Sequence, residues 1–152
     1  MAMAEPKASD ALTLEIVRKF DAPRERVFQA FVEPAQLIKW WGPTGMHVVD
    51  HDIDVRVGGA WRTTIRSKEG EDHTMSGVYR EITPHDRLVF TWGWERDGAR
   101  GHETVVTIEL SERDGRTTLF FNQQIFESED MRCSHQSGWS ESLDCLEEAL
   151  RQ

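Results

Sequence analysis

The chain has 152 residues, of which 38% are hydrophobic and six are tryptophans, and its formal net charge is −9. That length fits one domain by the usual size range, and the hydrophobic content is enough to fill a sizeable core. A surface with this charge repels the phosphates of nucleic acids and anionic membrane surfaces, so we expect binding to neither.

The cysteines and the N-terminal residues indicate the compartment. Cys133 and Cys145 lie on one expected helix, about 18 Å apart along its axis, which is far beyond disulfide reach. Free thiols fit a reducing compartment. Residues 1–10 lack the apolar segment of a signal peptide, and no stretch approaches the roughly 18 apolar residues of a membrane span. We therefore expect a cytoplasmic protein, with a flexible tail over 1–10 and one domain over 11–152.

A strand and two short helices are expected first. Alternating apolar residues predict a strand that ends at Phe20, and a helix starts at Pro23, since proline is tolerated in a first turn. A second short helix starts at Pro34 and carries Trp40 and Trp41. Adjacent residues on a helix point in different directions, so one of these indoles could be exposed to a partner, although packing under the rim of the sheet is favoured.

Six further strands are expected between residues 47 and 126. Apolar residues recur there with a period of two, and the Asp-Gly pair at 114–115 is a strong hairpin signal. Alternation places Val49 on the core face of the first of these strands. It places Phe121 and Ile125 on the core face of the last one.

The last element is a long amphipathic helix from Ser128 to Leu150. Its apolar residues recur at spacings of three and four, and Ser128 is a suitable N-cap. One such helix after a run of hairpins must cover the apolar face of an antiparallel sheet, which is an α+β arrangement. Its outer face is acidic and most simply solvated, although a basic partner could dock there. These acidic residues are Glu141, Asp144, Glu147 and Glu148.

A set of short motifs identifies a family. They are FDAPRERVF at 20–28, WWGP at 40–43, DVRVGGAWR at 54–62, GVYREI at 77–82, RLVFTW at 87–92, GW at 138–139 and SLDCLE at 142–147. In this order and spacing they resemble the activator of heat-shock-protein-90 ATPase homologue (Aha-like) family of the START/Bet v-like (SRPBCC) superfamily. The resemblance covers residues 12–150. It implies the helix-grip fold, in which a curved antiparallel sheet, in the element order β-α-α-β-β-β-β-β-β-α, wraps around the long C-terminal helix.

The resemblance also implies an internal, mostly apolar cavity between the sheet and the helix. Pockets for small molecules are mostly apolar with a few polar groups, and methionine adds adaptable walls. The expected lining residues are Trp41, Trp61, Met75, Trp92, Trp94, Phe121, Met131, His135 and Trp139. The alternative that these side chains simply fill the core stays open for each of them. On the helix, Gly138 and Ser142 join the candidate positions.

We expect the cavity to bind a small hydrophobic or aromatic molecule without a metal or cofactor. His47 and His51 share a strand face about 13 Å apart, so they cannot both bind one metal ion. His73 lies beside acidic residues in an expected mobile hairpin, where a role as a metal ligand is disfavoured.

Two other functions stay open. One is a cyclase or hydratase type of enzyme that uses the same cavity, with His135 as an acid or base near neutral pH. Further polar candidates are Arg62, Glu81 and Gln123, although Arg62 points away from the face of Trp61. The sequence contains no nucleophile or phosphate-binding motif.

The other function is a protein interaction, such as a chaperone accessory. Superfamily members also take part in stress resistance, and co-chaperone activity characterises larger relatives with an additional N-terminal domain. An edge strand of the sheet could also support a homodimer.

Overall fold

The computed structural model describes residues 12–151, so the flexible tail expected over 1–10 lies outside the described residues. The first strand, β1 (Leu14–Phe20), is followed by two short helices, α2 (Arg24–Val32) and α3 (Pro34–Leu37). Pro34 occupies the first turn of α3, where its missing N–H leaves no helical hydrogen bond unmade.

In the described part of the chain, seven strands follow α3. They are β2 (His47–Ile53), β3 (Ala60–Arg66), β4 (Asp72–Thr83), β5 (Arg87–Arg96), β6 (Ala99–Arg100), β7 (Thr104–Arg113) and β8 (Arg116–Gln124). The two-residue β6 is an addition to the expected order. It pairs back onto the end of β5 across the tight turn at Asp97 and Gly98.

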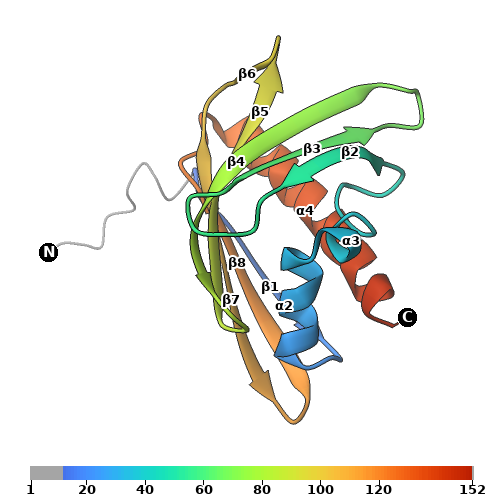
Figure 1. Cartoon of the computed structure of the whole chain (residues 1–152), viewed down its shortest axis with the longest axis vertical. Coiled ribbons are helices and arrows are strands. Elements are labelled where there is room, and N and C mark those ends of the chain that lie inside the picture. Colours follow the sequence, from blue (N-terminus) through green and yellow to red (C-terminus); the bar gives the residue numbers. More distant parts are fainter. Residues whose placement is uncertain (1–11, 152) are drawn as a thin grey trace, which may run out of the picture.

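The strands form one curved antiparallel sheet. Their order is β1-β8-β7-β5-β4-β3-β2, with β6 paired to β5. Strand β5 therefore joins one half of the sheet (β1, β8 and β7) to the other half (β4, β3 and β2). Figure 1 shows this sheet curving around α4 (Glu129–Leu150), which confirms the expected α+β helix-grip fold.

The long helix α4 begins and is anchored as its sequence predicts. The Ser128 side chain accepts the N–H of Met131 at 3.2 Å, which satisfies one of the unpaired donors of the first turn. Its 22 residues extend about 33 Å across the concave face of the sheet. Arg18 on β1 donates to Asp144 at 2.8 Å and so connects the edge strand to the helix. Among the described residues, no helix combines the length and the apolar character that crossing a membrane requires.

Two residues expected in the core are exposed instead. Val49 is 37% exposed because a β-bulge after Val48 shifts the register of β2, and Val48 packs inward in its place. Ile125 is 53% exposed because β8 ends before it and its φ angle is 75°. The chain reverses there, and Phe126 becomes the buried side chain.

The helix α3 ends at Leu37, before the two adjacent indoles that it was expected to carry, and both indoles are buried. Trp40 is 2% exposed and donates its indole N–H to the carbonyl of Ala30 at 2.9 Å. Trp41 is 6% exposed and donates to the hydroxyl of Thr63 at 3.0 Å. The favoured expectation, packing of both rings, is confirmed, and neither ring is available to a partner on the surface.

Candidate ligand-binding cavity

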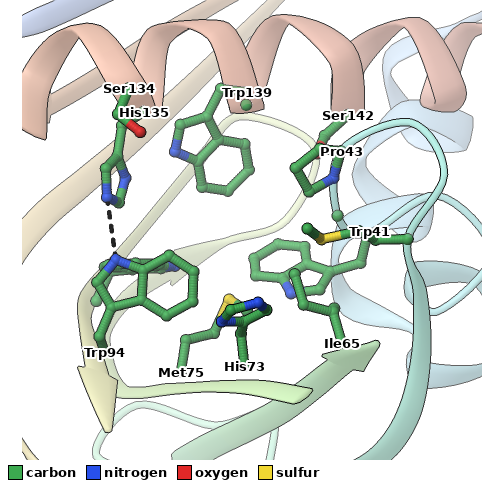
Figure 2. Close-up of a pocket in the computed structure, with 14 residues that line it drawn as sticks. Trp41, Pro43, Ile65, His73, Met75, Trp94, Ser134, His135, Trp139 and Ser142 are labelled. Carbon is green, nitrogen blue, oxygen red and sulfur yellow. Dashed lines mark hydrogen bonds between the residues drawn. The ribbon is translucent and has the colours of Figure 1, made fainter. Parts of the chain in front are cut away.

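A cavity of about 280 Å³ lies between α4 and the concave face of the sheet. Figure 2 shows His135, Trp139 and Ser142 on the helix at one side of it and Trp94, Met75 and Ile65 at the other. The lining residues are Trp41, Gly42, Pro43, Met46, Ile65, His73, Met75, Trp92, Trp94, Ser134, His135, Gly138, Trp139 and Ser142. The cavity is therefore walled by the sheet, by α4 and by the segment that joins α3 to β2.

Six of the nine residues expected from the sequence line this cavity. They are Trp41, Met75, Trp92, Trp94, His135 and Trp139. The two helix positions Gly138 and Ser142 line it as well. The structure thus brings these residues together, while the binding of a ligand by them stays a prediction.

The other three expected residues do not line the cavity. Trp61 packs against Trp41, with ring centroids 5.7 Å apart, and Phe121 packs against Trp139 at 4.6 Å. Both rings thus form a second layer that supports the cavity wall. Met131, in the first turn of α4, is half-buried at the margin of the core. Strand and helix periodicity places all three on inward faces, but it does not distinguish a first layer from a second.

Sequence reasoning missed part of the lining. The missed residues are Gly42, Pro43, Met46, Ile65, His73 and Ser134. A signal was present for Ile65, which alternates with Trp61 on the inward face of β3. Its cross-strand partner is His73, which lies within β4 rather than in a mobile hairpin, with its ring 6.2 Å from that of Trp94.

A buried chain of hydrogen bonds fixes two of the cavity walls. Trp139 on α4 donates to the Gln123 side-chain oxygen at 2.8 Å, and the Gln123 amide donates to the Thr104 hydroxyl at 2.7 Å. Thr104 in turn donates to the backbone carbonyl of Trp92 at 3.2 Å. Gln123 is fully buried. This candidate polar residue therefore joins α4 to β8, β7 and β5 rather than lining the cavity.

His135 is enclosed by aromatic rings at one end of the cavity. It is 8% exposed, and its ring centroid lies 4.6 Å from that of Trp92 and 5.1 Å from that of Phe126. The Trp94 indole N–H donates to Nε2 of His135 at 3.3 Å (Figure 2), so the neutral ring carries its proton on Nδ1. Burial lowers the pKa of His135 to about 4. This contradicts the expectation that His135 titrates near neutral pH.

The remaining polar candidates lie outside the cavity. Arg62 is exposed and donates to Glu95 at 3.1 Å, and Glu81 accepts from Arg87 at 3.1 Å. Both side chains thus serve ion pairs of the sheet. Within residues 12–151, no group of three His, Cys, Asp or Glu residues could hold a metal ion.

The segment from Gly42 to Met46 closes one end of the cavity beside Ser142, as Figure 2 shows for Pro43. Gly42 has a φ angle of 105°, a left-handed conformation that favours glycine. The backbone N–H of Thr44 donates to the Glu141 carboxylate at 3.1 Å. This contact connects the closing segment to α4.

Comparison with known proteins gives a consistent result. The family model described as Activator of Hsp90 ATPase homolog 1-like protein matches residues 21–151. A search of curated proteins finds no match. The crystal structure of the AHSA1 protein from Silicibacter pomeroyi is similar, with 32% identity, a TM-score of 0.84, and coverage of 91% of this chain and 97% of that chain.

Two further solved structures are also similar. A protein from Chromobacterium violaceum shares 30% identity at a TM-score of 0.80, over 93% of this chain and 98% of that chain. A protein from Arthrobacter aurescens shares 26% identity at a TM-score of 0.83, over 96% of this chain and 90% of that chain. Since the family match spans most of the sequence, this chain belongs to the Activator of Hsp90 ATPase homolog 1-like family, which has a START-like fold.

Proposed function

We propose that this protein binds a small apolar molecule in the cavity between α4 and the sheet. The observation that carries the proposal is the cavity itself, about 280 Å³ in volume and lined by four indole rings. Pockets for small molecules are mostly apolar and usually measure about 300–1,000 Å³. The size therefore favours a compact ligand over a long-chain lipid.

The composition of α4 supports the proposal. An empty apolar space destabilises a protein, because the atoms around it lose packing partners. The helix nevertheless presents Ser134, Gly138 and Ser142 to the cavity, where larger apolar side chains would fill it. START-like folds are known for ligand binding, and a space kept open in this way is consistent with an occupant.

Naphthalene is a suitable probe, because it is apolar, compact and aromatic. We expect it to raise the melting temperature of the protein in a concentration-dependent way, since a ligand that binds only the folded state stabilises it. Ser142→Leu extends a side chain into the cavity and should remove this effect. Ser137→Leu, on the exposed side of the same helix, is the matched control and should respond like the wild type. No shift in the wild type, or an equal shift in both variants, would contradict the proposal.

Catalysis in the same cavity has less support. His135 is neutral at pH 7, and its Nε2 lone pair already accepts the Trp94 N–H. A proton transfer there would first have to break that hydrogen bond. The cyclase or hydratase activity therefore stays a prediction, and unchanged turnover in His135→Ala would exclude this residue as its acid or base.

Interactions with other proteins also stay predictions. The family description refers to activation of the Hsp90 ATPase, and a pull-down with Hsp90 tests that role for this chain. Two exposed apolar side chains, Val17 and Phe120, are cross-strand partners on β1 and β8. Sedimentation tests whether an edge strand supports a homodimer, and cell fractionation tests the expected cytoplasmic location.

A further inference from the structure

The six indole N–H groups of this protein differ in their hydrogen bonding. Five of them donate to protein acceptors. These acceptors are Ala30 O for Trp40, Thr63 Oγ1 for Trp41, Thr91 O for Trp61, His135 Nε2 for Trp94 and Gln123 Oε1 for Trp139. Among residues 12–151, the Trp92 N–H has no acceptor, although Trp92 is only 4% exposed. Buried indole N–H groups are normally paired, so this exception indicates a partner from outside the chain.

The unpaired Trp92 N–H faces the cavity. Within the described part of the chain, every fully enclosed side-chain nitrogen or oxygen has a hydrogen-bond partner. The Trp92 nitrogen, which has none, must therefore border open space. Trp92 lines the cavity and is almost completely buried elsewhere, so the cavity is the space that its N–H reaches.

Trp92 is also held firmly in place. Its ring centroid lies 4.6 Å from those of both Trp94 and His135, in nearly perpendicular arrangements. Its backbone carbonyl accepts the hydroxyl of Thr104, which Gln123 fixes in turn. A donor held from several sides loses little freedom when it meets an acceptor, which favours binding.

The cavity lining contains two titratable side chains, His73 and His135. None of the described residues that line the cavity is Asp, Glu, Lys or Arg. His135 is neutral at pH 7 because burial lowers its pKa to about 4. A charged ligand would lose its hydration there without meeting a carboxylate, a lysine or an arginine, so the cavity favours uncharged molecules.

We infer that the ligand is an uncharged aromatic molecule with a hydrogen-bond acceptor, such as a ketone oxygen, that accepts the Trp92 N–H. This inference rests on the proposed function and adds the chemical class of the ligand. The perpendicular indoles Trp41 and Trp139, with centroids 5.3 Å apart, offer edges and faces that suit an aromatic ring. A ketone oxygen near Trp92 satisfies the one indole donor that the protein leaves unpaired.

Tetralin and 1-tetralone test the inference, because they differ by one ketone oxygen and little in size. We expect calorimetry at pH 7.5 to show that 1-tetralone binds about tenfold more tightly than tetralin, because its ketone oxygen gains one hydrogen bond from a buried donor. Burial of apolar area alone would favour tetralin. Trp92→Phe keeps a ring and removes the donor, so it should lose the preference for 1-tetralone and bind tetralin at least as tightly. Trp61→Phe, which removes an N–H already bonded to Thr91 behind the wall, should keep the preference.

Nuclear magnetic resonance gives a second measurement in the wild type. The Trp92 indole N–H signal, identified by its loss in Trp92→Phe, should shift downfield with 1-tetralone and not with tetralin. Equal affinity for both probes, or an unmoved signal, overturns the inference while the proposed function stands. Tighter binding of the anion 1-naphthoate than of 1-tetralone also overturns it. No binding of either neutral probe overturns the proposed function and the inference together.

Discussion

Along α4, the residues that line the cavity all lie in the first part (residues 129–142), whereas Leu143 and Leu146 in the second part (residues 143–150) pack on the core. His135 and Trp139 in the first part keep 8% and 7% exposure, which is where they border the cavity. Leu143 and Leu146 in the second part are fully buried. One helix therefore borders the cavity in its first part and packs the core in its second.

The two parts also differ in residue size. The fully buried positions in the second part are the leucines Leu143 and Leu146, which pack on the core. The positions in the first part that line the cavity include Gly138, Ser142 and the exposed Ser134, which are all small. The spacing of three and four continues through both parts, so the period alone does not reveal the cavity. The cavity is revealed instead by small residues within an otherwise apolar stripe.

The largest expected effect of a single substitution lies in the second part of α4. Leu146→Ala removes a fully buried side chain, and we expect the free energy of unfolding to fall by about 4 kcal/mol. Urea denaturation measures this loss. Naphthalene affinity should stay at the wild-type value at temperatures where the variant is folded, because Leu146 does not line the cavity. A loss below 1 kcal/mol would mean that this part of the helix is not closely packed.

The next effect concerns His135 and the pH. The pKa of His135 is about 4 in the folded state, below the ordinary value of 6.5, so the unfolded chain binds this proton first as the pH falls. The contribution of neutral His135 to the free energy of unfolding is therefore complete above pH 6.5. It is lost as the pH falls from 6.5 to 4, and the total loss is on the order of 3 kcal/mol.

The matched variant for this measurement is His135→Gln, whose side-chain oxygen can still accept the Trp94 N–H but does not titrate. Carboxylates also titrate in this range. The quantity to compare is therefore the difference in the free energy of unfolding between wild type and variant at each pH. We expect the wild type to lose stability relative to the variant steadily as the pH falls from 6.5 to 4. A constant difference would show that His135 is hydrated rather than buried.

The fold could be predicted from the sequence because its signals are local. Alternation, Asp-Gly turns and the capped amphipathic helix define the elements, and the motifs define their order. The errors occur where local geometry interrupts the period. The bulge after Val48 turns Val49 outward, and the positive φ angle of Ile125 ends the last strand one residue early.

The candidate site could be predicted only in part. Inward aromatic residues were found, but Trp61 and Phe121 lie one layer behind the wall, and that depth depends on how the sheet curves. Pro43 and Met46 reach the cavity because the segment after α3 folds against α4, a tertiary contact without a local pattern. The unpaired Trp92 donor appears only once all six indoles have been placed.

A smaller effect is expected at Trp139, where the two parts of α4 meet. An enclosed tryptophan costs 3–5 kcal/mol when it is cut back to alanine, but this ring borders a cavity that already exists, so we expect Trp139→Ala to cost about 2 kcal/mol. Naphthalene binding should be lost, because a wall is missing. Trp139→Phe keeps a ring against Phe121 but loses the hydrogen bond to Gln123 and part of the ring volume, so it should retain more stability than Trp139→Ala in thermal unfolding. A loss of 4 kcal/mol or more for Trp139→Ala would indicate a closed core instead.

The smallest effect has the opposite sign. Gly138 lies within α4, and a Cβ atom built there would lie 3.7 Å from Pro43 Cγ, which is an ordinary contact. Alanine suits a helix better than glycine, so Gly138→Ala should raise the free energy of unfolding by up to about 1 kcal/mol. The added methyl group also narrows the cavity, so naphthalene affinity should fall. Ser137→Ala, on the exposed side, should leave affinity unchanged. A more stable Gly138→Ala protein that binds less tightly would show that this helix gives up stability to keep its cavity open, whereas unchanged affinity would remove Gly138 from the binding surface.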